Sequence, residues 1–283
     1  MDLNEQTLRG WIGRSECAGD SALPAPLRGL AATLNRDDCV FAAGDAIPAC
    51  WHWLYFLHAA RACELGPDGH PERGGFLPPV ALPRRMWAGS RMEFLAPLRV
   101  GQALQRVSTI RDVTVKPGRS GPLAFVKVRR ELRGDDTLAI AEEEDIVYRD
   151  AQPARGPQPA GKPAPDNASW SRRIEPDPIL LFRYSALTFN GHRIHYDRPY
   201  ATEVEGYPGL VVHGPLLATL LLELLQGERP GDRVDTFRVR AVKPLFDTDA
   251  FDLCGRMADE KTAQLWARDA QGHIAMQATA TVD

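Results

Sequence analysis

The run Leu216–Leu225 constrains the fold of this chain more than any other segment. It reads Leu-Leu-Ala-Thr-Leu-Leu-Leu-Glu-Leu-Leu, so a helix over these residues would be apolar on almost every side. A surface helix keeps a polar face toward water, whereas a helix that is apolar all round must be buried. Pro215 suits the first turn of a helix. The run therefore predicts a helix, Pro215–Leu225, that is wrapped by a sheet.

A proline-rich segment divides the chain into two parts of domain size. Residues 151–165 contain five prolines among Gly, Ala and Gln: Pro153, Pro157, Pro159, Pro163 and Pro165. Such a segment has no apolar periodicity to bury and is typical of an exposed, extended linker. We therefore predict an N-terminal domain over 1–150, a linker over 151–171 and a C-terminal domain over 172–283.

The two parts show the same order of elements. Trp51–Leu65 is a candidate helix that follows Pro48 and ends at Gly66-Pro67, as Pro215–Leu225 is in the second part. Strand-like runs follow each helix: Arg91–Leu95, Leu104–Val115, Leu123–Leu132 and Thr137–Tyr148, then Thr236–Val242, Ala250–Met257, Ala263–Asp269 and His273–Val282.

This order predicts the fold. A helix followed by an antiparallel meander, twice over, is the plan of a double hotdog. The spacing from Pro97-Leu98 to Ala103 recurs from Pro244-Leu245 to Ala250, which supports a duplication. We predict an α+β double hotdog, in which two antiparallel sheets each wrap a central helix and join side by side.

Charge and cysteine content exclude several classes of protein. The net charge is −3 with mixed signs, which gives no electrostatic reason to expect nucleic acid or an anionic membrane as a partner. The five cysteines form no C-x-x-C pair, so neither a disulfide scaffold nor a zinc site is indicated. The polar N-terminus shows no secretory signal, and no apolar run approaches the ~20 residues of a membrane span. We predict a cytoplasmic protein.

The segment Phe182–Asp197 carries the candidate chemistry. An imidazole titrates near ~6.5, so His195 can accept and return a proton at neutral pH. Asn190 cannot transfer protons, but its amide can orient a water molecule. The dipeptide Asn190-Gly191 also favours a tight turn, and both interpretations are compatible.

A second candidate element precedes the apolar helix. His213-Gly214-Pro215 stands at the helix start, where unpaired N–H groups and the positive end of the helix dipole can stabilise an oxyanion. Gly214 would let a ligand approach the main chain closely. The alternative is an ordinary helix start with a glycine for the sharp turn, and His213 would then only shape the pocket.

The polar segment resembles the hydratase signature of the MaoC-like family. The commoner signature reads Tyr-Ser, a few residues, then Gly-Asp-x-Asn-Pro-(Leu/Ile)-His. Tyr184-Ser185 matches its start and Ile194-His195 its end, whereas Asn190 replaces the Asp and His192-Arg193 replaces Asn-Pro. The variant Phe-Asn-x-His-Arg-Ile-His is typical of the hydroxyacyl-thioester dehydratase type 2 branch and its mesaconyl- and itaconyl-CoA hydratases.

The resemblance extends over most of the chain, because Trp51–Phe56 and Leu77–Gly89 are also similar to the family. It implies the double hotdog fold and reversible hydration of an α,β-unsaturated acyl-CoA. It implies no cofactor and no metal, since CoA belongs to the substrate. With Asn190 in place of the Asp, His195 would deprotonate water and then protonate Cα. The first half has no comparable Asn-x-His-x-x-His segment, so we expect residues 1–150 to be non-catalytic and to form part of the pocket. We expect a homodimer or a monomeric double hotdog.

Further residues are candidates for supporting roles. Tyr184, Asp197 and His213 could orient His195 or the water. A substrate carboxylate or the CoA phosphates could be bound by arginines, each of which could also be an ordinary surface residue: Arg84, Arg85, Arg183 and Arg193. The cluster of Trp51, Trp53 and Tyr55 is more typical of core than of an acyl pocket. The spacing of His192, His195 and His213 gives little support to a metal triad.

The sequence does not identify a single substrate. A short dicarboxylic acyl group needs a cation in the pocket, because an unpaired buried carboxylate is costly. We favour hydration of itaconyl-CoA to citramalyl-CoA, with mesaconyl-CoA next. The alternatives are a dehydratase of straight-chain 3-hydroxyacyl thioesters, a hotdog thioesterase that uses Glu223, and a non-catalytic acyl-CoA-binding protein.

Overall fold

The structure is a computed structural model and describes residues 3–37, 40–118, 121–150 and 161–283. Its helices are α1 (Glu5–Arg9), α2 (Pro24–Thr33), α3 (Pro178–Leu187) and α4 (Gly214–Glu228), with short helical turns η1 (Trp51–Leu54), η2 (Ala62–Glu64), η3 (Arg193–His195) and η4 (Tyr200–Val204). Its strands are β1 (Ser15–Ser21), β2 (Arg84–Phe94), β3 (Ala103–Gly118), β4 (Gly121–Gly134), β5 (Thr137–Arg149), β6 (Trp170–Ile174), β7 (Val234–Ala241), β8 (Phe251–Met257), β9 (Thr262–Arg268) and β10 (Ile274–Val282).

The strands form one continuous antiparallel sheet of ten strands in the order β1-β3-β4-β5-β2-β7-β10-β9-β8-β6. Counted outward from the β2–β7 pair, the order is β2, β5, β4, β3, β1 on one side and β7, β10, β9, β8, β6 on the other. The two halves therefore repeat one topology, which confirms the predicted duplication and the double hotdog. The two sheets join side by side as predicted, through the β2–β7 pairing.

The predicted strands are confirmed, and their buried residues lie toward the core, whereas the edge strands β1 and β6, which were not predicted, have no buried residue. In β4, for example, Ala124, Val126, Val128 and Leu132 are buried and the residues between them are more exposed. Alternation of this kind is what a sheet with one face on the core requires. The structure lengthens β2 at its start, so that Arg84 and Arg85 lie in a strand rather than in a loop.

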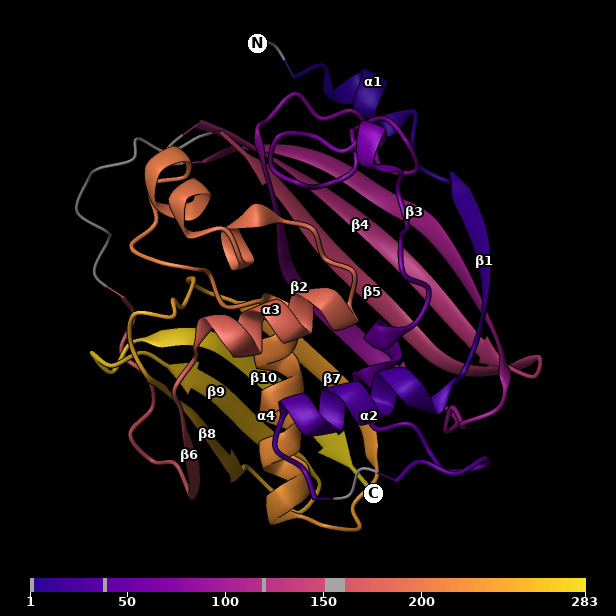
Figure 1. Ribbon diagram of the computed structural model, residues 1–283, viewed down its shortest axis with the longest axis vertical. Coiled ribbons are helices and arrows are strands. Elements are labelled where there is room, and N and C mark those ends of the chain that lie inside the picture. The colour runs from indigo at the N-terminus through magenta and orange to yellow at the C-terminus, as the bar shows by residue number, and fades with distance from the viewer. Residues whose placement is uncertain (1–2, 38–39, 119–120, 151–160) are drawn as a thin grey trace.

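Helix α4 packs on the sheet as predicted. Its leucines are buried nearly all round, and it contacts β6, β8, β9, β10 and β2. Figure 1 shows α4 against the C-terminal half of the sheet, with α3 and α2 crossing in front of it. Pro215 lies in its first turn, and the Thr219 hydroxyl donates to the Pro215 carbonyl at 2.9 Å.

The predicted helix Trp51–Leu65 is wrong beyond Leu54. The helical turn η1 ends at Leu54, because Tyr55 is extended and Phe56 has φ +57°, and η2 is a separate short turn. Tertiary contacts hold this bend: the Phe56 N–H donates to Asp20 Oδ2 at 2.6 Å, and the Tyr55 hydroxyl donates to the Leu23 carbonyl at 2.8 Å. In the N-terminal half, η1 and the loops after it therefore cover the sheet where a second central helix was expected.

The predicted linker is only partly described. Residues 151–160 lie outside the described ranges. Pro163 forms a bridge with His273, and Trp170–Ile174 pair with β8 as strand β6. The predicted boundary at residue 171 therefore falls inside a strand. Among the described residues, no helix has the length and apolar character needed to cross a lipid bilayer.

A glycine bulge marks the β2–β7 junction. Gly89 has φ +152° and pairs with Asp145 of β5 and with Arg240 of β7. A Cβ at this position would lie 2.3 Å from the Val239 carbonyl oxygen. Only glycine therefore lets the strands of the two halves approach this closely.

Candidate active site

A cavity of about 820 Å³ lies between the two halves of the chain, lined by residues from both. Six of the seven histidines line it: His52, His58, His70, His192, His195 and His213. The predicted site residues Tyr184, Asn190, Gly214 and Arg85 also line it. The structure thus brings together most of the residues that the sequence singled out.

The main chain fixes the tautomer of His195. This residue lies in η3 and is 8% exposed, and its Nδ1 is 2.7 Å from the carbonyl oxygen of Val211. A carbonyl oxygen only accepts hydrogen bonds, so Nδ1 carries the proton and donates it to this contact. In the neutral ring Nε2 then keeps its lone pair. His195 is therefore prepared to act as a base.

A second imidazole packs against the first. The rings of His195 and His213 stack with centroids 3.7 Å apart, and the edge of Tyr184 meets His213 at 5.0 Å. His213 Nε2 lies 2.8 Å from Ser185 Oγ, whereas its buried Nδ1 has no partner within the described residues. The His213 ring, itself in contact with Tyr184, thus packs flat against the His195 ring, and the supporting roles of both residues stay predictions.

Asn190 forms the predicted turn. Its Oδ1 accepts from the His192 N–H at 3.0 Å, and its own N–H donates to the Ser185 carbonyl at 2.8 Å. Phe189 before it has φ +50°. One lone pair of the amide oxygen is therefore used locally, and the NH₂ group is the part of Asn190 best able to contact a bound molecule.

The start of α4 offers a main-chain donor to the cavity. His213 is the N-cap residue and makes no side-chain capping bond, and Pro215 has no N–H. The Gly214 N–H has no acceptor within the described residues. A Cβ on Gly214 would lie 2.6 Å from the Trp87 ring, so this tryptophan packs directly on the main chain. The free N–H of Gly214 is the feature expected of an oxyanion contact, whereas the space beside its Cα is filled by Trp87.

Three candidates have other partners, and a fourth lies outside the cavity. Asp197 does not orient His195: it accepts from Arg193 Nε at 2.9 Å and from the Tyr200 N–H at 3.2 Å. Arg193 also donates to the Pro67 carbonyl at 3.0 Å. Arg84 is paired with Glu205 at 2.8 Å, and Arg183 is exposed on α3 and does not line the cavity.

Arg85 differs from the other three arginines. It lines the cavity close to Tyr148, and no carboxylate pairs with it within the described residues. Its positive charge lowers the pKa values of His70 and His192, so it lies close to the histidine cluster. Of the four predicted anion-binding arginines, Arg85 alone lines the large cavity.

Sequence reasoning missed other residues around the site. Trp53 and Tyr55, predicted as core, line the cavity, whereas Trp51 is fully buried and donates to Glu223 Oε1 at 3.1 Å. His70 and the Val211 carbonyl were not singled out. The sequence offers one weak signal for His70: the chain has only seven histidines, so each of them is a candidate for the site. An isolated histidine in a loop gives no other indication of its role.

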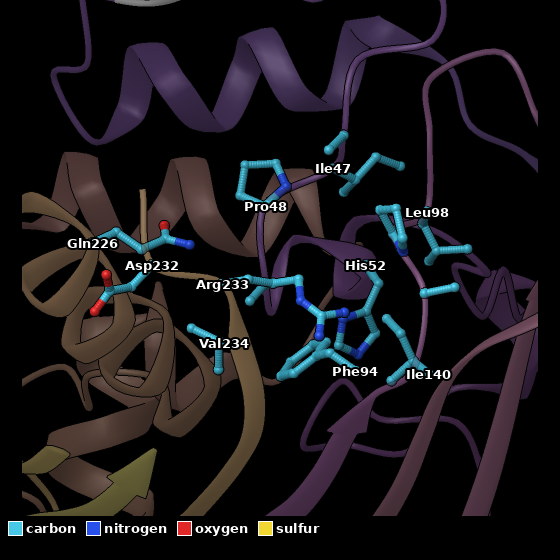
Figure 2. A pocket seen from close by; sticks show the side chains of 14 residues that line it. Ile47, Pro48, His52, Phe94, Leu98, Ile140, Gln226, Asp232, Arg233 and Val234 are labelled. Carbon is cyan, nitrogen blue, oxygen red and sulfur yellow. The ribbon is translucent and has the colours of Figure 1, made fainter. Parts of the chain in front are cut away.

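A smaller cavity of about 240 Å³ shares His52 with the larger one. Figure 2 shows its walls, which include Ile47, Pro48 and Leu98. Its charged residues are paired with one another or with neighbours: Arg229 donates to Asp232 at 2.7 Å, and Arg233 donates to Asp283 at 2.7 Å. The candidate chemistry therefore lies in the larger cavity.

Burial keeps the histidines neutral. It lowers the pKa of His195 to about 4, against the raising effect of the Val211 hydrogen bond. Burial, with the charges of His70 and His195, lowers the pKa of His192 to about 2. Burial also lowers the pKa of His213 well below its usual value. All three imidazole rings are thus neutral at pH 7, each with a single N–H proton.

Stability is expected to fall as the pH falls from 7 to 5. In the unfolded chain His195 takes up a proton near pH ~6.5, but in the folded chain only near pH 4, so the unfolded state binds more protons in between. At pH 5 this difference costs about 2 kcal/mol for His195, and His213 acts in the same direction. We expect Tm to drop by about 5 °C or more.

Differential scanning calorimetry at pH 7, 6 and 5 measures this drop. His195→Gln should reduce it, because the variant lacks one group that protonates only on unfolding. The exposed His58 serves as the control, since His58→Gln should leave the pH dependence unchanged. A Tm that is the same at all three pH values would contradict the prediction.

Comparison with known proteins adds to this geometry. The model of the family described as hydroxyacyl-thioester dehydratase type 2 matches residues 50–247. A mesaconyl-C(4)-CoA hydratase of Chloroflexus aurantiacus is 48% identical over 270 residues, which span 95% of each chain. A mitochondrial hydroxyacyl-thioester dehydratase type 2 of Schizosaccharomyces pombe is 28% identical over 272 residues, covering 86% of this chain and 89% of the relative.

Solved structures agree on the fold. A MaoC-like dehydratase from Phytophthora capsici superposes with a TM-score of 0.69 at 14% identity, covering 99% of this chain and 98% of that one. HtdX of Mycobacterium tuberculosis gives a TM-score of 0.63 at 18% identity, covering 94% and 99%. At these identities the likeness bears on the fold alone.

Proposed function

Because the chain belongs to the hydroxyacyl-thioester dehydratase type 2 family, we propose that it catalyses the reversible hydration of a short α,β-unsaturated acyl-CoA. One observation supports the mechanism. Because Nδ1 of His195 donates to the Val211 carbonyl, Nε2 keeps a free lone pair, and it does so in the cavity that Gly214 also lines with a free N–H. A base and an oxyanion donor in one cavity are what addition of water to an enoyl thioester requires.

The steps follow from these two groups. Nε2 of His195 removes a proton from water, and the hydroxide oxygen bonds to Cβ. The alkene electrons move to the thioester oxygen, which accepts a hydrogen bond from the Gly214 N–H at the positive end of the α4 dipole. The imidazolium then returns the proton to Cα. With its low pKa, His195 is both unprotonated before the reaction and strongly acidic once protonated.

The substrate we propose is mesaconyl-C4-CoA, with citramalyl-CoA as the product. The most similar of the curated relatives above carries the name of a mesaconyl-C(4)-CoA hydratase. In this thioester the alkene is conjugated with the carbonyl, so negative charge reaches the oxygen beside Gly214. In itaconyl-CoA that yields the same citramalyl-CoA, the alkene is one carbon further away and the oxyanion contact cannot help. The mechanism therefore favours mesaconyl-CoA of the two substrates considered.

Arg85 is the cation we propose for the free carboxylate of this substrate. A planar guanidinium binds a carboxylate through two parallel hydrogen bonds. Arg85 lines the same cavity as His195, and the Tyr148 hydroxyl next to it offers a further polar contact. A straight-chain acyl group would leave this charged side chain without an anion.

The thioesterase alternative is weakened by the position of Glu223. This carboxylate accepts from Trp51 Nε1 and from Arg36 Nη1, both at 3.1 Å, and it does not line the large cavity. These contacts tie α4 to η1 and to the residues after α2. Glu223 is thus a structural group, and water activation by a carboxylate of the central helix is not supported.

The function is tested by supplying mesaconyl-C4-CoA, itaconyl-CoA and a medium-chain 2-enoyl-CoA in parallel. For the two conjugated thioesters we expect loss of enoyl-thioester absorbance without release of thiol, and conversion of itaconyl-CoA is followed by chromatography of the product. The highest kcat/KM is expected for mesaconyl-C4-CoA. Release of free thiol would instead identify a thioesterase. A preference for the medium chain would overturn the substrate while leaving the hydration chemistry in place.

A further inference from the structure

A cluster of three metal-ligating side chains borders the cavity. One donor atom each from Asp68, His70 and His192 lies within 4.8 Å of the other two. The rings of His70 and His192 have centroids 4.0 Å apart, and His70 Nδ1 is 3.1 Å from Asp68 Oδ2. We propose that these three side chains bind one divalent transition-metal ion of the zinc type.

The main chain holds the two contributing segments together. Gly69 has φ +84°, and a Cβ on it would lie 2.0 Å from the Gly191 carbonyl oxygen. The Arg193 N–H donates to the Asp68 carbonyl at 2.9 Å, and the Gly66 N–H donates to the His70 carbonyl at 2.8 Å. The donors are therefore positioned before a metal arrives, which lowers the ordering cost of binding.

The donor set suits zinc. Two imidazole nitrogens and one carboxylate oxygen, at about 2.0–2.2 Å from the ion, form a common three-ligand zinc set with a fourth position left open. Neither ring nitrogen of His192 makes a hydrogen bond to the described residues. A small inward shift of the side chains would bring the three atoms to coordination distance.

Two positive charges limit the affinity of the proposed site for a metal ion. Arg73 and Arg85 both act on the His70 ring. Arg73 donates to the carbonyls of Val80, Leu82 and Pro83 and is thereby fixed in place. A cation beside these guanidinium groups binds less tightly than in a neutral site, so we expect a dissociation constant in the micromolar range.

The location of the ion has a consequence for turnover, which rests on the proposed function. His70 and His192 line the same cavity as His195, and the His192 and His195 rings have centroids 5.5 Å apart. An ion with an open coordination position here would take a water or an anion in the space that the acyl group needs. Zinc should therefore inhibit hydration in competition with the substrate.

Direct binding is the first test and needs no turnover. Co²⁺ is titrated into the purified full-length protein and followed by its visible absorption, and Zn²⁺ by calorimetry. We expect one bound ion, with affinity lowered by at least about 10- to 100-fold in both Asp68→Asn and His192→Gln, because losing even an outer-shell partner of a ligand costs that much. His58→Gln removes an exposed histidine of the same cavity that is outside the cluster, and it should bind as the unaltered protein does.

Undiminished binding in both ligand variants, or no binding at millimolar metal, would overturn the site. His70→Gln provides a further variant if one of the others fails to fold. In a second experiment Zn²⁺ is added to the hydration assay, where Asp68→Asn should need at least tenfold more metal for half-inhibition. Since binding is measured apart from turnover, a protein that binds metal but does not hydrate mesaconyl-C4-CoA would contradict the proposed function and leave the site intact.

Discussion

Replacing His195 with alanine is expected to lower kcat for hydration of mesaconyl-C4-CoA by about 10²–10⁴-fold, the usual effect of losing a general acid/base. The variant should lower kcat and leave KM nearly unchanged, because His195 both takes the proton from water and returns it to Cα. Initial rates of enoyl absorbance loss give kcat and KM. Circular dichroism and Tm show whether the variant is folded, and His195→Gln fills the buried space if alanine does not suffice.

Two variants calibrate this result. His58→Ala changes another histidine that lines the cavity but is exposed, and it should keep full activity. Asn190→Ala should reduce kcat less than His195→Ala, because a misplaced water can still react. Unchanged turnover in His195→Ala would remove the site from consideration. Equal losses in the Asn190 and His195 variants would indicate that the two residues act as one unit.

Arg85→Leu is expected to reduce kcat/KM for mesaconyl-C4-CoA by about 10²–10³-fold, because leaving one charge of a buried pair without its partner costs roughly 2–5 kcal/mol. Crotonyl-CoA has the same conjugated alkene and no free carboxylate, so its turnover by the variant should be nearly unchanged. The ratio of the two kcat/KM values is the measurement, and it is insensitive to partial misfolding.

Arg84→Leu is the matched control for Arg85. It removes the neighbouring arginine, whose guanidinium is paired with Glu205 and stacks on Tyr207. This variant should lower stability but leave the ratio for the two substrates unchanged. If Arg85→Leu reduced both substrates equally, Arg85 would be a structural residue and the carboxylate would need another partner.

The sequence predicted the elements whose residues show local periodicity. The alternating residues of β3, β4 and β5 and the apolar run of α4 each show their environment within a dozen residues. Trp51–Leu65 has a helix-like composition. Hydrogen bonds to Leu23 and Asp20, however, hold Tyr55 extended and Phe56 in a left-handed conformation, which ends the helical turn. That contact joins residues more than thirty positions apart, so no local pattern could reveal it.

The residues of the candidate site also fall into two groups, those that a local sequence pattern indicates and those that only the tertiary structure reveals. Asn190, His195 and Gly214 lie within one stretch of sequence, and all three line the cavity. The four arginines could not be ranked, because a guanidinium is available only if no carboxylate reaches it first. Glu205 pairs with Arg84 and Asp197 with Arg193, and these pairings depend on the tertiary structure. His70 enters the site from the other half of the chain, which no spacing rule links to the signature.

The contact between His195 and Val211 has a consequence for how this enzyme can change. The partner of Nδ1 is a peptide oxygen, and every amino acid supplies the same oxygen at that position. No single codon change at residue 211 can therefore delete the orienting group, as it could an aspartate in that role. Random mutagenesis should find variants that move this peptide, through the packing of Val211 against Ile194 and Tyr200, but none that abolish it outright.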